Sequence, residues 1–519
     1  MLTHHRDFLY EISPADRLIF ERVLPQKSRL LDMLEVIDWA SFEQHLGAYY
    51  NQKLGQPAYP PLIMFKIEFL RYFYNLSDRQ VIERCWTDLQ FRYFLQIGIT
   101  ANLPDASNLP RFRGRLGVDG FTKLFDELVK QARDAGLVKD RLRLKDASHV
   151  IANIAVPSTL GLLAQLRNRM LAVIDRVDPE IAEGFRVALQ LSRESTAQAD
   201  DETKLQERLE LVTSMLHWIQ SQSRTGPLAE TLEWKNLQTV KELAEKIVGD
   251  CTNPGQGDRT LSVVDPDARC GKHGDFYDGY MLDILMDADS ELITSIDVLP
   301  ANADEAANAI ALLEHEQQTH SNQVKELSID GIGFNGKVLN QLQDPAGVNI
   351  EVTVPTRDFT KTAGFPASDF EFVEEGTRVL CPAGKTSGQA TKKTDKPNVT
   401  FFQFSGATCQ SCPLLQQCHP EKKEGSRTGR RVSKNQYEAE YERARAKAKT
   451  PHYESVRKEH PRVERKLNEL VRHHRCRNAR YWGEAKVTIQ GYMTALAVNA
   501  KRITKLILLS RLAPVTATC

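Results

Sequence analysis

The sequence predicts a mixed α/β fold with a helical N-terminal domain, and three observations support this. Apolar residues recur at helical spacing from residue 14 to about residue 135. From Arg141 the stretch RLRLKDASHV alternates apolar and polar residues, which is the period of a strand. After Leu261, strand-like and helix-like segments alternate. This alternation indicates a mixed sheet covered by helices, and a chain of 519 residues is expected to form roughly two to four structural units.

The N-terminal domain, expected over residues 1–135, has features of a DNA-binding domain. Ser77 and Gln80 fit a capping box that opens a helix at SDRQVIERCW. A second short basic stretch, NLPRFRGRLG, follows Asp105. Two short helices there would present arginines to DNA in a helix-turn-helix-like arrangement: Arg79, Arg84, Arg111, Arg113 and Arg115. An ordinary helical bundle explains the same pattern equally well, so both interpretations stay open.

A helical insertion is predicted within the sheet region, at about residues 156–250. Two apolar stripes with alternating steps of three and four run through it: Leu163, Leu166, Met170, Val173 and Val177, then Leu205, Leu209, Val212, Leu216 and Ile219. The polar stretch around residues 197–202 joins the stripes, which predicts a helical hairpin that packs on its own domain rather than dimerising. The surrounding core is expected over residues 136–370, with a β-hairpin turn at Asp287 to Ser290.

Three acidic residues occupy positions from which they could bind metal ions. Asp146 lies in the first predicted strand, and Asp330 ends the strand VKELSID before a Gly-x-Gly turn. Glu464 borders the apolar stripe of a helix that Pro461 would open. Phosphodiester cleavage requires charge neutralisation on the attacking and leaving oxygens, which two carboxylate-bound Mg²⁺ (or Mn²⁺) ions about 4 Å apart supply.

The pattern alone does not single out these three carboxylates. Most Asp and Glu residues are solvated surface groups. Asp265 and Asp267 of the stretch DPDAR form a rival pair, which we interpret as supporting or DNA-contacting residues. The choice of the three therefore depends on the motifs around them.

Four of the nine cysteines are grouped within residues 371–434, a region of short predicted strands and loops. Cys409, Cys412 and Cys418 follow one another closely, and Cys381 precedes them by 28 residues. Four thiolates suit a tetrahedral structural Zn²⁺, with His419 as a substitute ligand. Four reduced thiols in a small subdomain are the alternative. The odd total of cysteines argues against a disulfide framework.

Basic residues concentrate near the C-terminus although the formal net charge of the chain is zero. Residues 421–511 hold 24 Lys and Arg against 10 Glu and no Asp, a net charge of +14. A polyanion would contact this segment, although solvated basic helices are the alternative. The helices expected over residues 435–519 would complete the sheet region and offer these residues to DNA: Arg462, Arg465, Arg472, Arg475, Arg477, Arg480 and Lys486. Tyr481 and Trp482 would either stack on an unpaired base or anchor the loop.

The sequence favours a cytoplasmic protein without a membrane partner. No apolar run reaches the roughly 18 residues needed to span a bilayer. The N-terminal stretch MLTHHRDFLYEIS lacks the apolar core of a signal peptide.

Several motifs resemble the DDE-class transposases of bacterial insertion sequences. KDASHVIANIA is similar to the segment of their first Asp, and SIDGIGFNG to the turn of their second Asp. RVERKLNELVRHHRCRNARYWGEAKVTIQGYMTALAVNAKRI is similar to their Glu helix and the helix after it. VDPDARCGKHGDFYDGYMLDILMDADSELITSIDVLPANADE resembles their second and third strands. PADRLIFERVLPQ through RFRGRLG is similar to the helical domain that often precedes them, so the resemblance covers nearly the whole chain.

The resemblance implies an RNase H-like catalytic core in which Asp146, Asp330 and Glu464 bind Mg²⁺ and catalyse cleavage and strand transfer. It implies double-stranded DNA as the partner, as transposon ends and as target, with a homodimer in the DNA complex at the bacterial nucleoid. Related transposases often place an Arg four residues before the Glu and a Lys seven after it; here these positions hold His460 and Val471. Another RNase H-like nuclease, or a transposase-derived DNA-binding protein that does not cut, is the alternative.

Overall fold

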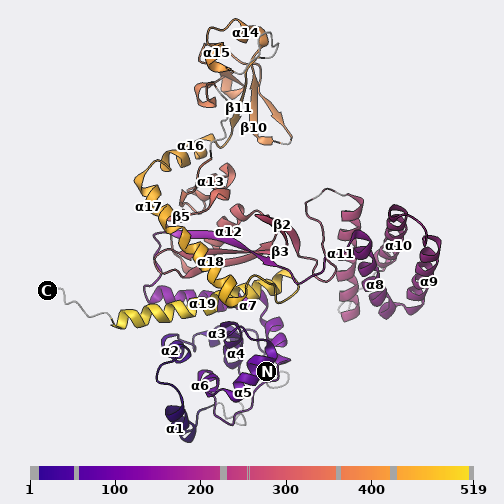
Figure 1. The fold of residues 1–519 in the computed structure, drawn as a ribbon, viewed down its shortest axis with the longest axis vertical. Helices are drawn as coiled ribbons and strands as arrows, with labels where there is room; N and C mark the ends of the chain where they lie inside the picture. Colours follow the sequence, from indigo (N-terminus) through magenta and orange to yellow (C-terminus); the bar gives the residue numbers. More distant parts are fainter. Residues whose placement is uncertain are drawn as a thin grey trace, which may run out of the picture. The chain divides into compact units, whose positions relative to one another are not determined.

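The computed structural model describes residues 11–51, 58–222, 231–253, 255, 257–357, 364–394, 396–420 and 429–512 (Figure 1). The chain forms two compact units. The first consists of Met1–Lys139, Asp146–Asp304 and Val463–Cys519, and the second of Asp140–Lys145 and Glu305–Arg462. No helix among the described residues is long and apolar enough to cross a membrane. Three stretches used in the sequence predictions lie outside the described residues: residues 1–10, residues 421–428 of the basic segment, and Cys519.

The N-terminal region is helical, as the sequence predicted. Its described helices are α1 (Pro14–Val23), α2 (Arg29–Val36), α3 (Phe42–Gly47), α4 (Pro61–Phe73), α5 (Asp78–Thr87), α6 (Leu89–Leu95) and α7 (Asn108–Asp134). Side chains cap several of them. Ser77 and Gln80 form the predicted capping box of α5, and Asp88 accepts from the N–H of Gln90 at the start of α6.

A buried ionic network joins α4, α5 and α7. Glu68 of α4 is fully buried, and Arg113 of α7 donates to it at 2.5 Å and to Asp78 of α5 at 2.6 Å. Arg71 of α4 also pairs with Asp78, at 2.5 Å. An unpaired charge in such a place would be strongly destabilising, so the pairs fix how these helices pack. Arg113, one of the arginines expected to face DNA, therefore has its partners inside the bundle.

A six-stranded mixed sheet follows the N-terminal helices. Its strands are β1 (Arg143–Ile151), β2 (Arg269–His273), β3 (Asp275–Asp287), β4 (Ile293–Pro300), β5 (Glu326–Ser328) and β6 (Glu351–Thr353). Their order is β2-β3-β1-β5-β6, with β4 also paired to β3. β3 runs antiparallel to β2 and β4, whereas β5 runs parallel to β1 and β6. The β3–β4 hairpin has the predicted turn, where the Asp287 carboxylate accepts from the Ser290 N–H at 2.8 Å.

The insertion between β1 and β2 contains four described helices, so the prediction of a two-helix hairpin was wrong: α8 (Thr159–Val177), α9 (Pro179–Ser195), α10 (Asp201–Ser221) and α11 (Leu232–Thr252). Asp178 and Pro179 end α8 and open α9, because the Asp178 carboxylate accepts from the N–H of Ile181. The side chain of Thr231 caps α11 in the same way.

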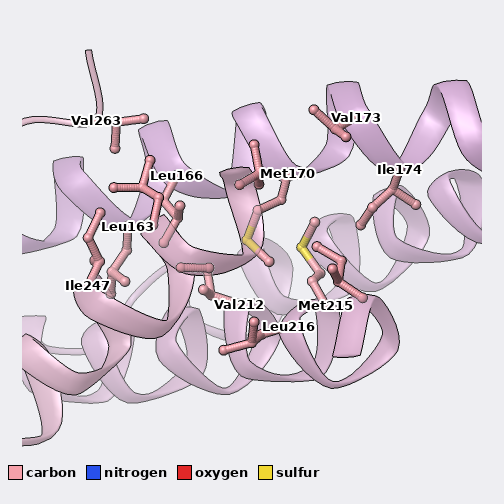
Figure 2. Close-up of a cluster of buried hydrophobic side chains, with 14 of the residues drawn as sticks. Leu163, Leu166, Met170, Val173, Ile174, Val212, Met215, Leu216, Ile247 and Val263 are labelled. Carbon is pink, nitrogen blue, oxygen red and sulfur yellow. The ribbon is translucent and has the colours of Figure 1, made fainter. Parts of the chain in front are cut away.

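The two predicted apolar stripes lie on α8 and α10 and face each other. Figure 2 shows Leu163, Leu166 and Met170 pointing toward Val212 and Leu216 in one apolar core. Seven of the ten stripe residues are buried in this core, and Leu205 and Leu209 pack against it, so the stripes pack within the insertion.

The cysteine-containing region consists of short elements around a small core. These are β7 (Glu371–Val373), β8 (Arg378–Leu380), β9 (Thr391–Lys393), β10 (Lys396–Gln403), α14 (Gly406–Gln410), α15 (Leu415–Cys418) and β11 (Arg431–Asn435). The core side chains are Phe370, Val379, Phe402, Phe404 and Val432. Strands β9, β10 and β11 form one antiparallel sheet, and β7 pairs with β8.

The remaining helices are α12 (Glu305–His320), α13 (Gly336–Leu342), α16 (Glu438–Lys447), α17 (Pro451–Glu459), α18 (Pro461–His474) and α19 (Glu484–Leu512). The buried Asn499 of α19 exchanges two hydrogen bonds with the main chain of Ile293, at 2.9 and 2.7 Å, and so ties α19 to β4. The sequence predicted helices over residues 435–519, and residues 475–483, between α18 and α19, are not helical. This segment instead bonds to the end of β1, where the Ile151 N–H donates to the Arg477 carbonyl at 2.7 Å.

Candidate active site

Asp146 is a half-buried residue of β1. The residues before it are buried and paired: Lys145 donates to the Glu305 carbonyl at 2.8 Å, and Arg143 donates to Glu316 at 2.6 Å. These interactions fix the beginning of the strand, because moving it would leave a buried charge without its partner, which is strongly destabilising. The carboxylate of Asp146 accepts from the N–H of Ala147 at 2.9 Å. The first candidate ligand thus stands on a well-anchored strand.

Asp330 stands in a tight turn directly after β5. Its half-buried side chain accepts from the N–H of Ile332 at 3.1 Å and caps the short helix η2 (Gly331–Gly333). A Cβ atom at Gly333 would lie 2.5 Å from Cγ2 of Ile329, and one at Gly331 would lie 3.3 Å from Nη2 of Arg357. The two glycines therefore allow the backbone to turn closely around the carboxylate.

Asp146 belongs to β1 and Asp330 follows β5, and these two strands are parallel neighbours. Leu144 of β1 pairs with Ser328 of β5. Each aspartate follows its strand's paired residue by two positions. Asp146 belongs to the first compact unit and Asp330 to the second, so the convergence of their carboxylates stays a prediction.

Glu464 lies in the first turn of α18 and its side chain is exposed. Pro461 opens this helix, as predicted, and the buried face consists of Val463, Leu467 and Leu470. A carboxylate in the first turn is favoured by the positive end of the helix dipole. The packing of the stripe leaves Glu464 available to an external group.

Arg457 and His460 anchor the end of α17 to the end of β5, a contact that the sequence did not predict. Arg457 donates to Ser328 Oγ at 3.2 Å and to the Ile329 carbonyl at 3.0 Å. Nδ1 of the buried His460 lies 3.0 Å from the same Ser328 Oγ. Because Ser328 accepts from Arg457, its hydroxyl proton is free to point to Nδ1. One side of this contact, Ser328 and Ile329, directly precedes Asp330 in the chain. The other side, Arg457 and His460, directly precedes α18, the helix that carries Glu464.

Two buried histidines should make the protein acid-sensitive. Burial, and secondarily Arg457, lowers the pKa of His460 to about 4; burial, and secondarily Lys501, lowers that of His474 to about 4. The unfolded chain takes up these protons near pH 6.5, before the folded protein does. The free energy of unfolding should therefore be constant above about pH 7 and fall between about pH 6.5 and 4, by on the order of 1–3 kcal/mol per histidine.

Urea unfolding between pH 7.5 and 5 measures this effect. The variants His460→Gln and His474→Gln should each lose part of the pH dependence, whereas His217→Gln at an exposed position of α10 serves as control. A wild-type stability that stays level down to pH 5 would contradict the neutral, buried state of these rings.

The seven basic residues expected to bind DNA fall into three groups. Four are exposed: Arg465, Arg472, Arg475 and Lys486. Arg462 is half-exposed and pairs with Glu459 at 3.3 Å. Arg477 donates to the His149 carbonyl at 3.0 Å, and Arg480 donates to the Leu76 carbonyl and the Asn75 side chain. The last two guanidinium groups hold the segment after α18 in place within the protein.

The aromatic residues of the same segment act as anchors in the structure. The Tyr481 ring lies between Arg71 and Arg113, whose guanidinium carbons are 5.6 and 5.2 Å from its centroid. Nε1 of Trp482 donates to the Asn153 carbonyl at 3.0 Å, although about half of this side chain is exposed. The anchoring alternative from the sequence therefore describes Tyr481.

Asp265 and Asp267 cap the start of α19. Asp265 is fully buried and accepts from Tyr280 Oη at 2.5 Å and from the Gly483 N–H at 2.9 Å. Asp267 accepts from the N–H of Glu484 at 3.1 Å. Both bonds satisfy donors that a helix leaves free at its N-terminus. Burial raises the pKa of Asp265. This geometry gives the rival pair of carboxylates a structural role.

The four grouped cysteines, Cys381, Cys409, Cys412 and Cys418, line one pocket. Their convergence was required by the zinc hypothesis, because 28 residues separate the first two in the sequence. Across the described ranges, no group of three or more His, Cys, Asp or Glu is already arranged to hold a metal ion.

Comparisons with known families agree with the motifs. A family model described as a transposase domain (DUF772) matches residues 18–115, and one described as a transposase DDE domain matches residues 380–504. Both family models thus describe transposase domains, and they match two separate parts of the chain. The first match covers helices of the N-terminal region, and the second contains Glu464, the four cysteines and most of α19.

The chain is also 27% identical over 126 residues to the uncharacterized protein ORF8 in the nfe locus of Rhizobium meliloti. That match covers 24% of this chain and 59% of the relative, so the chain spans about three fifths of the relative's length. No solved structure matches the chain. Asp146 and Asp330 lie outside both family matches, and their assignment stays a prediction.

Proposed function

We propose that this transposase binds the terminal inverted repeats of an insertion sequence and cuts and joins DNA there with Asp146, Asp330 and Glu464. The observation that carries the proposal is the parallel register of β1 and β5, in which each aspartate follows a paired residue by two positions. Aspartates at matched positions of adjacent strands favour a shared cation site. The order of the mixed sheet, with β1, β5 and β6 parallel and β2, β3 and β4 antiparallel, supports an RNase H-like core.

The three carboxylates fit Mg²⁺ or Mn²⁺. All their donor atoms are hard oxygens, and the two aspartates are half-buried while Glu464 is exposed, so each can reach an ion that arrives with DNA. When bound, a pair of such ions neutralises charge on the attacking and leaving oxygens of the phosphodiester. The residues of this chain contribute fixed positions: Asp146 through its anchored strand, Asp330 through its tight turn, and Glu464 through the packed face of α18.

The phosphates of the DNA would lie beside Glu464. Arg465 and Arg472 are exposed on the same helix, and Arg475 follows it directly. Guanidinium groups there neutralise phosphates and fix the scissile bond without reading its sequence. We further propose that a homodimer holds the two ends of the element and the target, at the bacterial nucleoid.

Cleavage of linear DNA that carries the element's own ends tests the proposal. We expect cuts at the ends in Mg²⁺ or Mn²⁺, none with EDTA, and none on a fragment with scrambled ends. Equal cutting of both fragments would indicate a general nuclease instead. Binding of the ends without cutting in either metal would indicate a transposase-derived DNA-binding protein.

A further inference from the structure

We propose that Cys381, Cys409, Cys412 and Cys418 bind one structural Zn²⁺ and that this ion stabilises the region between β7 and β11. The inference does not depend on the proposed catalytic residues. All four are free cysteines that line a single pocket although they come from separate stretches of the chain. Cys381 follows β8, Cys409 and Cys412 flank the end of α14, and Cys418 ends α15.

Backbone N–H groups already point at two of the sulfur atoms. The N–H of Lys385 donates to Cys381 Sγ at 3.4 Å, and the N–H of Arg430 donates to Cys409 Sγ at 3.3 Å. The first bond closes a turn that also contains the Gly384 N–H to Cys381 carbonyl bond, at 2.8 Å. Such donors stabilise a thiolate over a thiol, and supporting hydrogen bonds of this kind orient the ligands of metal sites.

The four thiols share one small pocket. All four side chains line the same pocket, together with Phe365, Phe404 and Arg430. Thiolates that gather in one pocket repel each other unless a cation binds them. Four sulfur ligands favour Zn²⁺ or iron. We choose Zn²⁺ because it has no redox chemistry and commonly serves as a structural ion in small folding units.

Among its described residues, the region has a small apolar core. Its apolar core consists of Phe370, Val379, Phe402, Phe404 and Val432, and Cys381, Cys409 and Cys418 pack against that core half-buried. Small folding units with so few buried side chains commonly need a metal or disulfides. The ion would draw together thiols that the fold has already brought to one pocket.

Metal analysis of the purified full-length protein tests the proposal. We expect about one zinc per chain in the wild type and less than about a fifth of that in Cys409→Ser and Cys412→Ser, because a site that loses one of four ligands binds far more weakly. Cys270→Ser, an exposed cysteine of β2, should keep the full zinc content.

A second measurement guards against variants that fail to fold. Titration of the metal-stripped wild type with Co²⁺ should give the visible absorption of a tetrahedral thiolate complex, which Zn²⁺ then displaces. Zinc below about 0.2 per chain with no cobalt spectrum would overturn the proposal. Stoichiometric iron would overturn the choice of zinc, and equal zinc in Cys270→Ser, Cys409→Ser and wild type would place the metal elsewhere.

Discussion

Asp146→Asn, Asp330→Asn and Glu464→Gln are each expected to lower cleavage at the transposon ends by about a hundred- to a thousandfold. That is the scale on which loss of one group that stabilises transition-state charge acts. The amides keep the shape of the side chains but lose the negative charge that binds a divalent cation. Binding of the ends should change by less than about threefold, because affinity for DNA comes mainly from phosphate contacts made by basic residues.

A mobility-shift assay in Ca²⁺ and a cleavage assay in Mg²⁺ on the same end fragment measure the two effects separately. Glu469→Gln is the matched control, since Glu469 is on α18 with Glu464 but pairs with Lys466 at 2.9 Å. Its cleavage rate should stay within a few-fold of the wild type. Wild-type cleavage by any of the three site variants would remove that residue from the mechanism.

Features of the fold with local causes could be predicted from the sequence. The capping box at Ser77, the hairpin turn at Asp287 and the helix opened by Pro461 each depend on residues within one turn of one another. The missed helix α9 also had local signals, namely Asp178 and Pro179 at its start. We missed those signals because the regular apolar stripes on either side of α9 were interpreted as the two helices of one hairpin.

The same distinction between local and long-range causes applies to the candidate site. Resemblance indicated the three carboxylates, and their local settings in a strand, a turn and a helix agree with the expected ones. The partners of Arg477 and Arg480 could not be predicted, because His149 and Leu76 lie hundreds of positions away in the chain. The anchor of Arg457 and His460 on Ser328 escaped prediction for the same reason.

The distinction between exposed and internally bonded arginines leads to the second large expected effect. The combined variant Arg465→Gln, Arg472→Gln, Arg475→Gln should weaken binding to transposon ends and to unrelated DNA alike. Each phosphate contact that is lost should flatten the slope of log K against log salt by about 0.9, so three contacts give about two to three. All three side chains are exposed and make no ion pair among the described residues, so the fold should be retained.

Arg477→Gln and Arg480→Gln, which change internally bonded arginines, should behave in the opposite way to the combined exposed variant. Their guanidinium groups donate to His149, Leu76 and Asn75, so the loss of these bonds should lower the free energy of unfolding by about 1–3 kcal/mol. The salt slope of the folded fraction should stay close to that of the wild type. Salt titrations of binding, run beside urea unfolding of each variant, separate the two behaviours. If the combined exposed variant keeps the wild-type slope, the DNA contacts another surface. If it loses affinity for the ends alone, these arginines read bases, and the helical N-terminal region is not the part that recognises the inverted repeat.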